Sequence, residues 1–88
     1  MGIDPKVIRR ALDRSIQSIL TKDRNAHSYN YQLFESFSGI VDKCLAGHQD
    51  LGVQEYSVFF AAATALSPYL MPEEEAMLDK LEKLSFVS

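Results

Sequence analysis

Cysteine is scarce in this chain of 88 residues, and this scarcity limits its chemistry. The one cysteine, Cys44, cannot form an internal disulfide. A lone thiol is compatible with a reducing compartment, and residues 1–10 hold no uninterrupted apolar run that could form a signal-peptide core. We therefore expect a cytoplasmic protein.

Long hydrophobic runs and alternating patterns are also missing. The longest apolar window, residues 53–71, contains Glu55 and Pro68. Its uncharged part is well short of the roughly 20 residues that cross a bilayer, so we expect no membrane span. No segment alternates apolar and polar residues over a useful length, so we expect no sheet. With 47% hydrophobic and 24% charged residues, the composition is that of a globular chain.

Lysine and arginine are absent between Lys43 and Lys80. They concentrate instead in residues 4–24, where six basic residues face three acids. The net charge of -3 gives no electrostatic argument for nucleic acid binding. The asymmetry favours a first helix that lies against an acidic neighbour, in its own chain or in another, with a solvated basic face as the alternative.

The central stretch, residues 56–66, carries no charge and shows apolar residues on every side of a helix. A helix of this kind has to be enclosed by other elements. We expect a helix from about Val53 to Leu66, capped by Asp50, sealed from solvent and ended by Ser67-Pro68. Its anchors in the core or in a dimer interface would be Tyr56, Phe59, Phe60, Ala63 and Leu66.

Three further helices are predicted around this centre. The first is capped by Asp4, with Pro5 at its first position. The second is capped by Ser28 or Asn30 and runs to about Ala46, with Gly47 as a left-handed stop. Gly39 inside it suggests a close helix crossing. The fourth starts at Pro72, after a corner at residues 68–71. The expected buried stripes are Ile8, Ala11, Leu12, Ser15, Ile16, Ile19 and Leu20; then Leu33, Phe34, Phe37, Ile40, Val41, Cys44 and Leu45; then Met77, Leu78, Leu81 and Leu84.

These elements predict an all-α, four-helix compact bundle over residues 1–88, in which two long amphipathic helices and a short C-terminal helix surround the apolar one. Three helices cannot easily enclose the fourth in so short a chain. A second copy is the simplest cover, so we expect a homodimer.

Catalytic and metal-binding motifs are weak. Cys44 and His48 stand four residues apart, but Gly47 is expected to end the helix between them. A zinc site from these two residues, Asp50 and His27 would lack the usual spacings. Residues 52–59 resemble the exit of a calcium loop and residues 51–58 a helix-turn-helix turn, yet both lack the necessary ligands or base-reading side chains. The sequence contains no phosphate loop or serine elbow. We therefore expect no enzyme activity, cofactor or metal.

The functional expectation is a small protein–protein interaction or regulatory protein that acts through a helical surface. Arginine and tyrosine are enriched at interface hot spots. The candidate partner-binding residues are therefore Arg9, Arg10, Arg14, Tyr29 and Tyr31. The alternative is a nucleic-acid-associated regulator that uses the basic face of the first helix.

Overall fold

The computed structural model describes residues 3–22 and 27–86, with side chains described for 3–22 and 31–86. These residues form α1 (Pro5–Lys22), α2 (His27–Leu45), α3 (Val53–Leu66), a short 3-10 helix η1 (Ser67–Tyr69) and α4 (Pro72–Ser85). No strand occurs in the described ranges. The all-helical, four-helix prediction is therefore confirmed.

Several helix ends follow the predicted signals. The backbone N–H of Lys6 donates to Asp4 Oδ1 at 3.0 Å, which makes Asp4 the cap of α1. Gly47 has a φ of 92° after α2, the left-handed geometry that glycine adopts without a steric cost. Pro68 lies in η1 and Pro72 opens α4, as their missing donors require.

Two predicted caps are wrong. The backbone of α2 is already helical at His27, so Ser28 and Asn30 lie inside the helix and do not cap it. Gly52, not Asp50, precedes α3, and its N–H donates to Glu55 Oε2 at 3.1 Å. A side chain from within the first turn thus replaces the expected cap.

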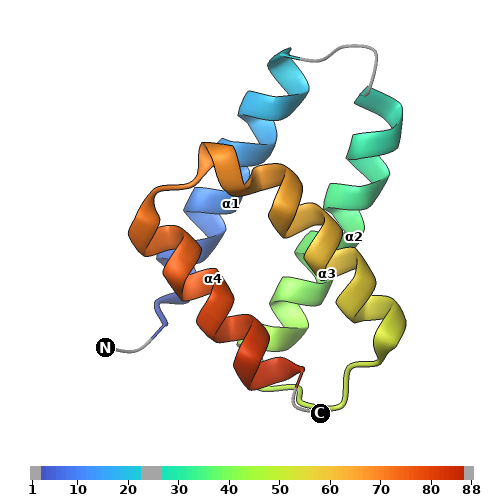
Figure 1. Cartoon of the computed structure of the whole chain (residues 1–88), viewed down its shortest axis with the longest axis vertical. Helices are drawn as coiled ribbons and strands as arrows, with labels where there is room; N and C mark the ends of the chain where they lie inside the picture. Colours follow the sequence, from blue (N-terminus) through green and yellow to red (C-terminus); the bar gives the residue numbers. More distant parts are fainter. Residues whose placement is uncertain (1–2, 23–26, 87–88) are drawn as a thin grey trace.

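The helices form two layers (Figure 1). The long helices α1 and α2 pair in one layer, and α3 and α4 lie across them, joined at the corner made by η1. Both α3 and α4 pack on α1 and α2 more than on each other. The shortest extent of the fold is 17 Å, which fits two helix layers.

The core lies between the two layers. The Phe37 and Phe59 rings meet edge to face with centroids 5.2 Å apart, which fixes α3 on α2. Ser15 is buried with them, and its hydroxyl donates to the Ala11 carbonyl at 2.7 Å. The buried apolar residues of this core are Ile8, Leu12, Phe34, Phe37, Ile40, Val41, Cys44, Phe59, Ala62, Leu66, Leu78 and Leu81.

Within one chain, residues 56–66 are not sealed from solvent, and their cover by a second copy stays a prediction. Phe59 and Leu66 are buried and Ala63 is half-buried, but Tyr56 is 40% and Phe60 58% exposed. These two side chains are exposed because α3 lies in one of the two layers, so only one of its faces points toward the core between them. The helical prediction for this segment is confirmed, and its enclosure is not.

Two smaller expectations also need correction. Leu84 is 51% exposed, and Ser85 takes the buried position at the end of α4. Gly39 does not mark a helix crossing, because a Cβ added there would meet no heavy atom within 4 Å. The predicted stripes otherwise supply the core, since most of their members are buried or half-buried.

Candidate functional site

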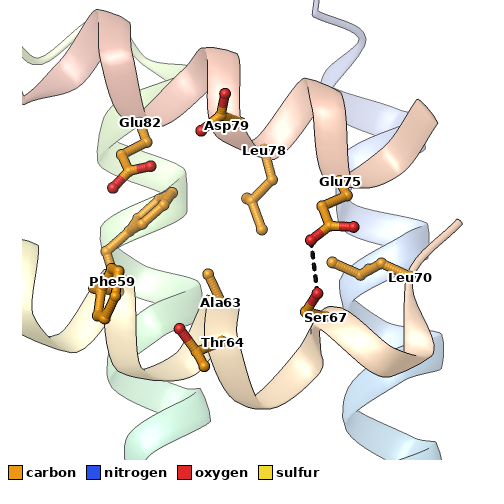
Figure 2. A pocket seen from close by; sticks show the side chains of 10 residues that line it. Phe59, Ala63, Thr64, Ser67, Leu70, Glu75, Leu78, Asp79 and Glu82 are labelled. Carbon is orange, nitrogen blue, oxygen red and sulfur yellow. Dashed lines mark hydrogen bonds between the residues drawn. The ribbon is translucent and has the colours of Figure 1, made fainter. Parts of the chain in front are cut away.

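An open groove of about 220 Å³ lies between α3 and α4. Phe60, Ala63 and Thr64 line one side from α3, and Leu78 lies on the α4 side. Figure 2 shows Leu78 pointing from α4 toward α3 across the opening. Because α3 and α4 each rest on the α1/α2 layer, the space between them is left partly unfilled.

The α3 side of the groove continues into an exposed aromatic pair. The Tyr56 and Phe60 rings stack with centroids 6.3 Å apart and planes inclined by 20°. Phe86, just after α4, meets Tyr56 edge to face at 5.3 Å and Phe59 at 5.4 Å. These ring contacts hold Phe86 against α3. Large aromatic surface is thereby held in place at one end of the groove.

Carboxylates occupy the α4 side of the groove. Glu75, Asp79 and Glu82 all line it, and among the described residues no lysine, arginine or histidine does. Ser67 Oγ donates to Glu75 Oε1 at 2.6 Å, as Figure 2 shows, and Asp79 Oδ2 lies 3.2 Å from Lys83 Nζ. A hydrogen bond with Glu82 raises the pKa of the Tyr56 hydroxyl above its ordinary value. The groove is thus apolar on one wall and acidic on the other.

Two of the three predicted arginines form ion pairs within the chain. Arg9 Nη2 lies 3.0 Å from Asp42 Oδ1 on α2, and Arg14 pairs with Glu74 at the start of α4. The hydrogen bond with Glu74 raises the pKa of Arg14 and lowers that of Glu74. Arg10 is exposed. The predicted acidic neighbour of the first helix therefore lies in its own chain.

Of the two predicted tyrosines, Tyr31 is the one whose side chain is described, and it does not line the groove. Tyr31 is 53% exposed and borders a separate hollow between α1 and α2, with Ile16 and Leu20. Tyr29 lies outside the residues whose side chains are described. Arg9, Arg14 and Tyr31 each border a different hollow. A common partner-binding site for the five candidate residues stays a prediction.

Cys44 and His48 lie in different environments, one buried and one exposed. Cys44 is buried, and desolvation raises the pKa of its thiol, which disfavours the nucleophilic thiolate. His48 is exposed beyond the end of α2, with its Nδ1 3.7 Å from Asp50 Oδ1. Among the described residues no group of three or more potential metal ligands gathers. His27 lies outside the described side chains.

None of the helices described has both the length and the apolar character that crossing a membrane requires. The fold and the groove define a small all-helical protein. No protein-family model matches the chain, and neither curated proteins nor solved structures include a match to it.

Sequence reasoning missed the acidic wall. Its signals were present, since Glu75, Asp79 and Glu82 follow at i, i+4 and i+7, and the first two lie in the segment that lacks lysine and arginine. What the sequence did not show is that this stripe stands opposite Phe60 and Ala63. That placement depends on the corner at η1 and on the packing of both helices against α1 and α2.

Proposed function

We propose that this chain is a non-enzymatic protein-interaction or regulatory domain whose contact surface is the outer face of α3. The observation that carries the proposal is the 58% exposure of Phe60, in a helix whose other face is buried in the core through Phe59 and Leu66. Its stacking on Tyr56 pre-orders both rings, so a partner would bury aromatic surface at little conformational cost.

A non-enzymatic role is supported by the state of Cys44 and His48. The thiol is buried with a raised pKa, and the imidazole stands on an exposed turn. Neither of them lines the groove between α3 and α4. A cytoplasmic location is part of the proposal, because a lone thiol is compatible with a reducing compartment.

Self-association is the second candidate, and the same exposed rings favour it. A second copy that covered Tyr56 and Phe60 would complete the enclosure that the uncharged stretch of α3 calls for. A homodimer would have twice the chain mass of 9.9 kDa, and Phe60→Glu would return it to the monomer. A nucleic-acid-associated role on α1 has less support, since Arg9 and Arg14 each pair with an acid.

Site-specific photo-crosslinking tests the proposal. A photoreactive residue at position 60 is compared with one at Gln54, which is exposed on the same helix. In cells that produce the protein, position 60 should give discrete adducts that position 54 does not. An adduct of twice the chain mass identifies the homodimer, and other discrete masses identify a different partner. Equal, diffuse labelling at both positions would remove α3 as a contact surface.

A further inference from the structure

The groove between α3 and α4 carries a charge pattern that specifies its occupant. Tyr56, Phe60 and Ala63 of α3 follow at i, i+4 and i+7, and Ser67, the first residue of η1, continues the same side at i+11. On α4, Glu75, Asp79 and Glu82 follow at i, i+4 and i+7. One stripe offers mainly apolar surface, and the stripe opposite offers three carboxylates.

The acidic stripe is costly in the free protein. Like charges at i and i+4 on a helix repel each other, as Glu75 and Asp79 do, and Glu82 lies at i+3 from Asp79. The partners described for these carboxylates are the Ser67 hydroxyl, the Tyr56 hydroxyl and Lys83. The two hydroxyl groups are neutral, so they leave the negative charges of Glu75 and Glu82 in place. A cationic ligand would relieve this repulsion, and an anionic one would increase it.

The ends of the groove set the length of chain that it can hold. The hydrogen bond between Ser67 and Glu75 closes one end, as Figure 2 shows, and the Tyr56–Phe86 ring contact lies at the other. The eight steps of helical rise from Phe59 to Ser67 span about 12 Å. That length matches roughly two turns of a helix laid alongside.

We propose that this groove binds a short basic amphipathic helix of another protein, which presupposes that α3 is a partner-binding surface. Two apolar side chains at i and i+3 or i+4 of the ligand enter between Phe60 and Leu78. Lysine or arginine side chains on the flank toward α4 meet Glu75, Asp79 and Glu82. Aromatic and aliphatic contact supplies affinity, and the carboxylates select the sign of the ligand.

A second copy of the chain does not supply this chemistry. The basic helix is α1, and its apolar stripe, including Ile8 and Leu12, is already buried in the core. An isologous pairing through the groove would bring two copies of the same acidic stripe to one interface, where the described lining residues include no cation to meet them. The charge of the groove therefore favours a different protein over a homodimer.

The test uses defined peptides and the whole chain. The probe is a leucine–lysine peptide of about 15 residues, long enough to be helical, with leucines along one stripe. Its matched controls are a leucine–glutamate peptide of the same pattern and a leucine–lysine peptide with the same composition in scrambled order. Amide chemical shifts and fluorescence anisotropy measure the site and the affinity. The patterned basic peptide should bind, with shifts confined to residues 59–67 and 75–82.

Two matched pairs of variants complete the experiment. Asp79→Lys, in the lining, should weaken binding of the basic peptide about fivefold or more, while Glu73→Lys, on the same helix outside the lining, should change it far less. Phe60→Ala should weaken binding, and Val53→Ala, an exposed apolar residue of α3 outside the groove, should not. Circular dichroism confirms that each variant is folded.

The outcomes separate this inference from the proposed function. Equal binding of the basic and acidic peptides, shifts outside the groove, or no binding at all overturns the inference. If position 60 then crosslinks a partner without a basic amphipathic segment, the interaction function stands and only the ligand class is wrong. If position 60 gives no specific adduct, the interaction function itself fails, whatever the peptides do.

Discussion

Gly39 lies in the interior of α2 on the solvent side, and a methyl group added there would meet no other atom within 4 Å. Its backbone is helical, so alanine can adopt the same conformation. Alanine loses less backbone entropy on folding than glycine does, and we expect Gly39→Ala to raise the free energy of unfolding by about 0.5–1 kcal/mol. Urea unfolding followed by circular dichroism measures the change.

Gly47 provides the matched control for this substitution. Its φ of 92° lies in the left-handed region, where a Cβ is strained even though space is available. Gly47→Ala should therefore lower the free energy of unfolding by about 1–2 kcal/mol. A loss of stability in Gly39→Ala as well would mean that position 39 is crowded or not helical in solution.

Cys44 is 5% exposed, and burial raises the pKa of its thiol. Both effects suppress the thiolate that reacts with electrophiles. At neutral pH the native thiol should react with a disulfide reagent on the order of a hundredfold more slowly than in urea, because reaction requires an opening of the structure. Absorbance of the released thiolate follows the reaction.

An exposed thiol on the same helix supplies the reference rate. Ser36 is exposed on α2, so Ser36→Cys in a Cys44→Ala background should react in the native protein nearly as fast as it does in urea. A native Cys44 that reacts at the rate of the position-36 thiol would contradict its burial and reopen a chemical role for this residue.

At the scale of the element, α3 has one face in the core and one in solvent, and two adjacent phenylalanines lie on these two different faces. Phe59 is 1% and Phe60 58% exposed. Phe59→Ala should lower the free energy of unfolding by about 3–5 kcal/mol, because it leaves a cavity against Phe37. Phe60→Ala should lower it by less than about 1 kcal/mol. Thermal and urea unfolding measure both, and similar losses would show that Phe60 is covered in solution.

Helix positions were largely predictable because their signals are local. Asp4, Gly47 and Pro72 act through the geometry of their own backbone and of the next turn, so the sequence is enough to locate them. The cap of α3 was missed because Glu55 reaches back to Gly52 from within the helix. Competition between Asp50 and Glu55 depends on the path of the turn, which local propensity does not determine.

At the scale of the whole molecule, the enclosure of α3 could not be judged from composition. An uncharged helix predicts burial on all sides, but four helices of this length form two layers, and each outer helix keeps an open face. The groove arises from the same arrangement. The acids of its α4 wall were visible in the sequence as a stripe, while their position opposite Phe60 is a product of tertiary packing.

The ion pair between Arg14 and Glu74 joins the first helix to the last, across 60 positions of sequence. Arg14 also reaches the Tyr69 carbonyl at the corner, and the Met71 N–H donates to Glu74 Oε1 at 2.8 Å. This cluster holds α1, η1 and the start of α4 together. Because the hydrogen bond with Arg14 lowers the pKa of Glu74, the pair makes the stability of the whole fold depend on pH.

The direction of that dependence follows from proton binding. As pH falls, Glu74 takes up a proton in the unfolded chain, near the ordinary value of 4.5, before it does so in the folded one. The stabilisation by Glu74 is therefore complete above that value and is lost as pH falls through the lowered folded pKa. We expect the difference in urea midpoint between wild type and Glu74→Gln to be constant from about pH 7 to 5.5 and to close as the pH falls from 4.5 through the lowered folded pKa of Glu74.

Glu73→Gln is the matched control, because it removes the same charge one position earlier, at an exposed site outside the Arg14 contact. Its midpoint should stay close to that of wild type at every pH. A gap for Glu74→Gln that does not narrow at all as the pH falls below 4.5 would mean that packing of the side chain, and not its ionised form, joins α1 to α4. A gap that closes as the pH falls through the lowered pKa of Glu74 would identify the Arg14–Glu74 pair as the electrostatic link between the two layers.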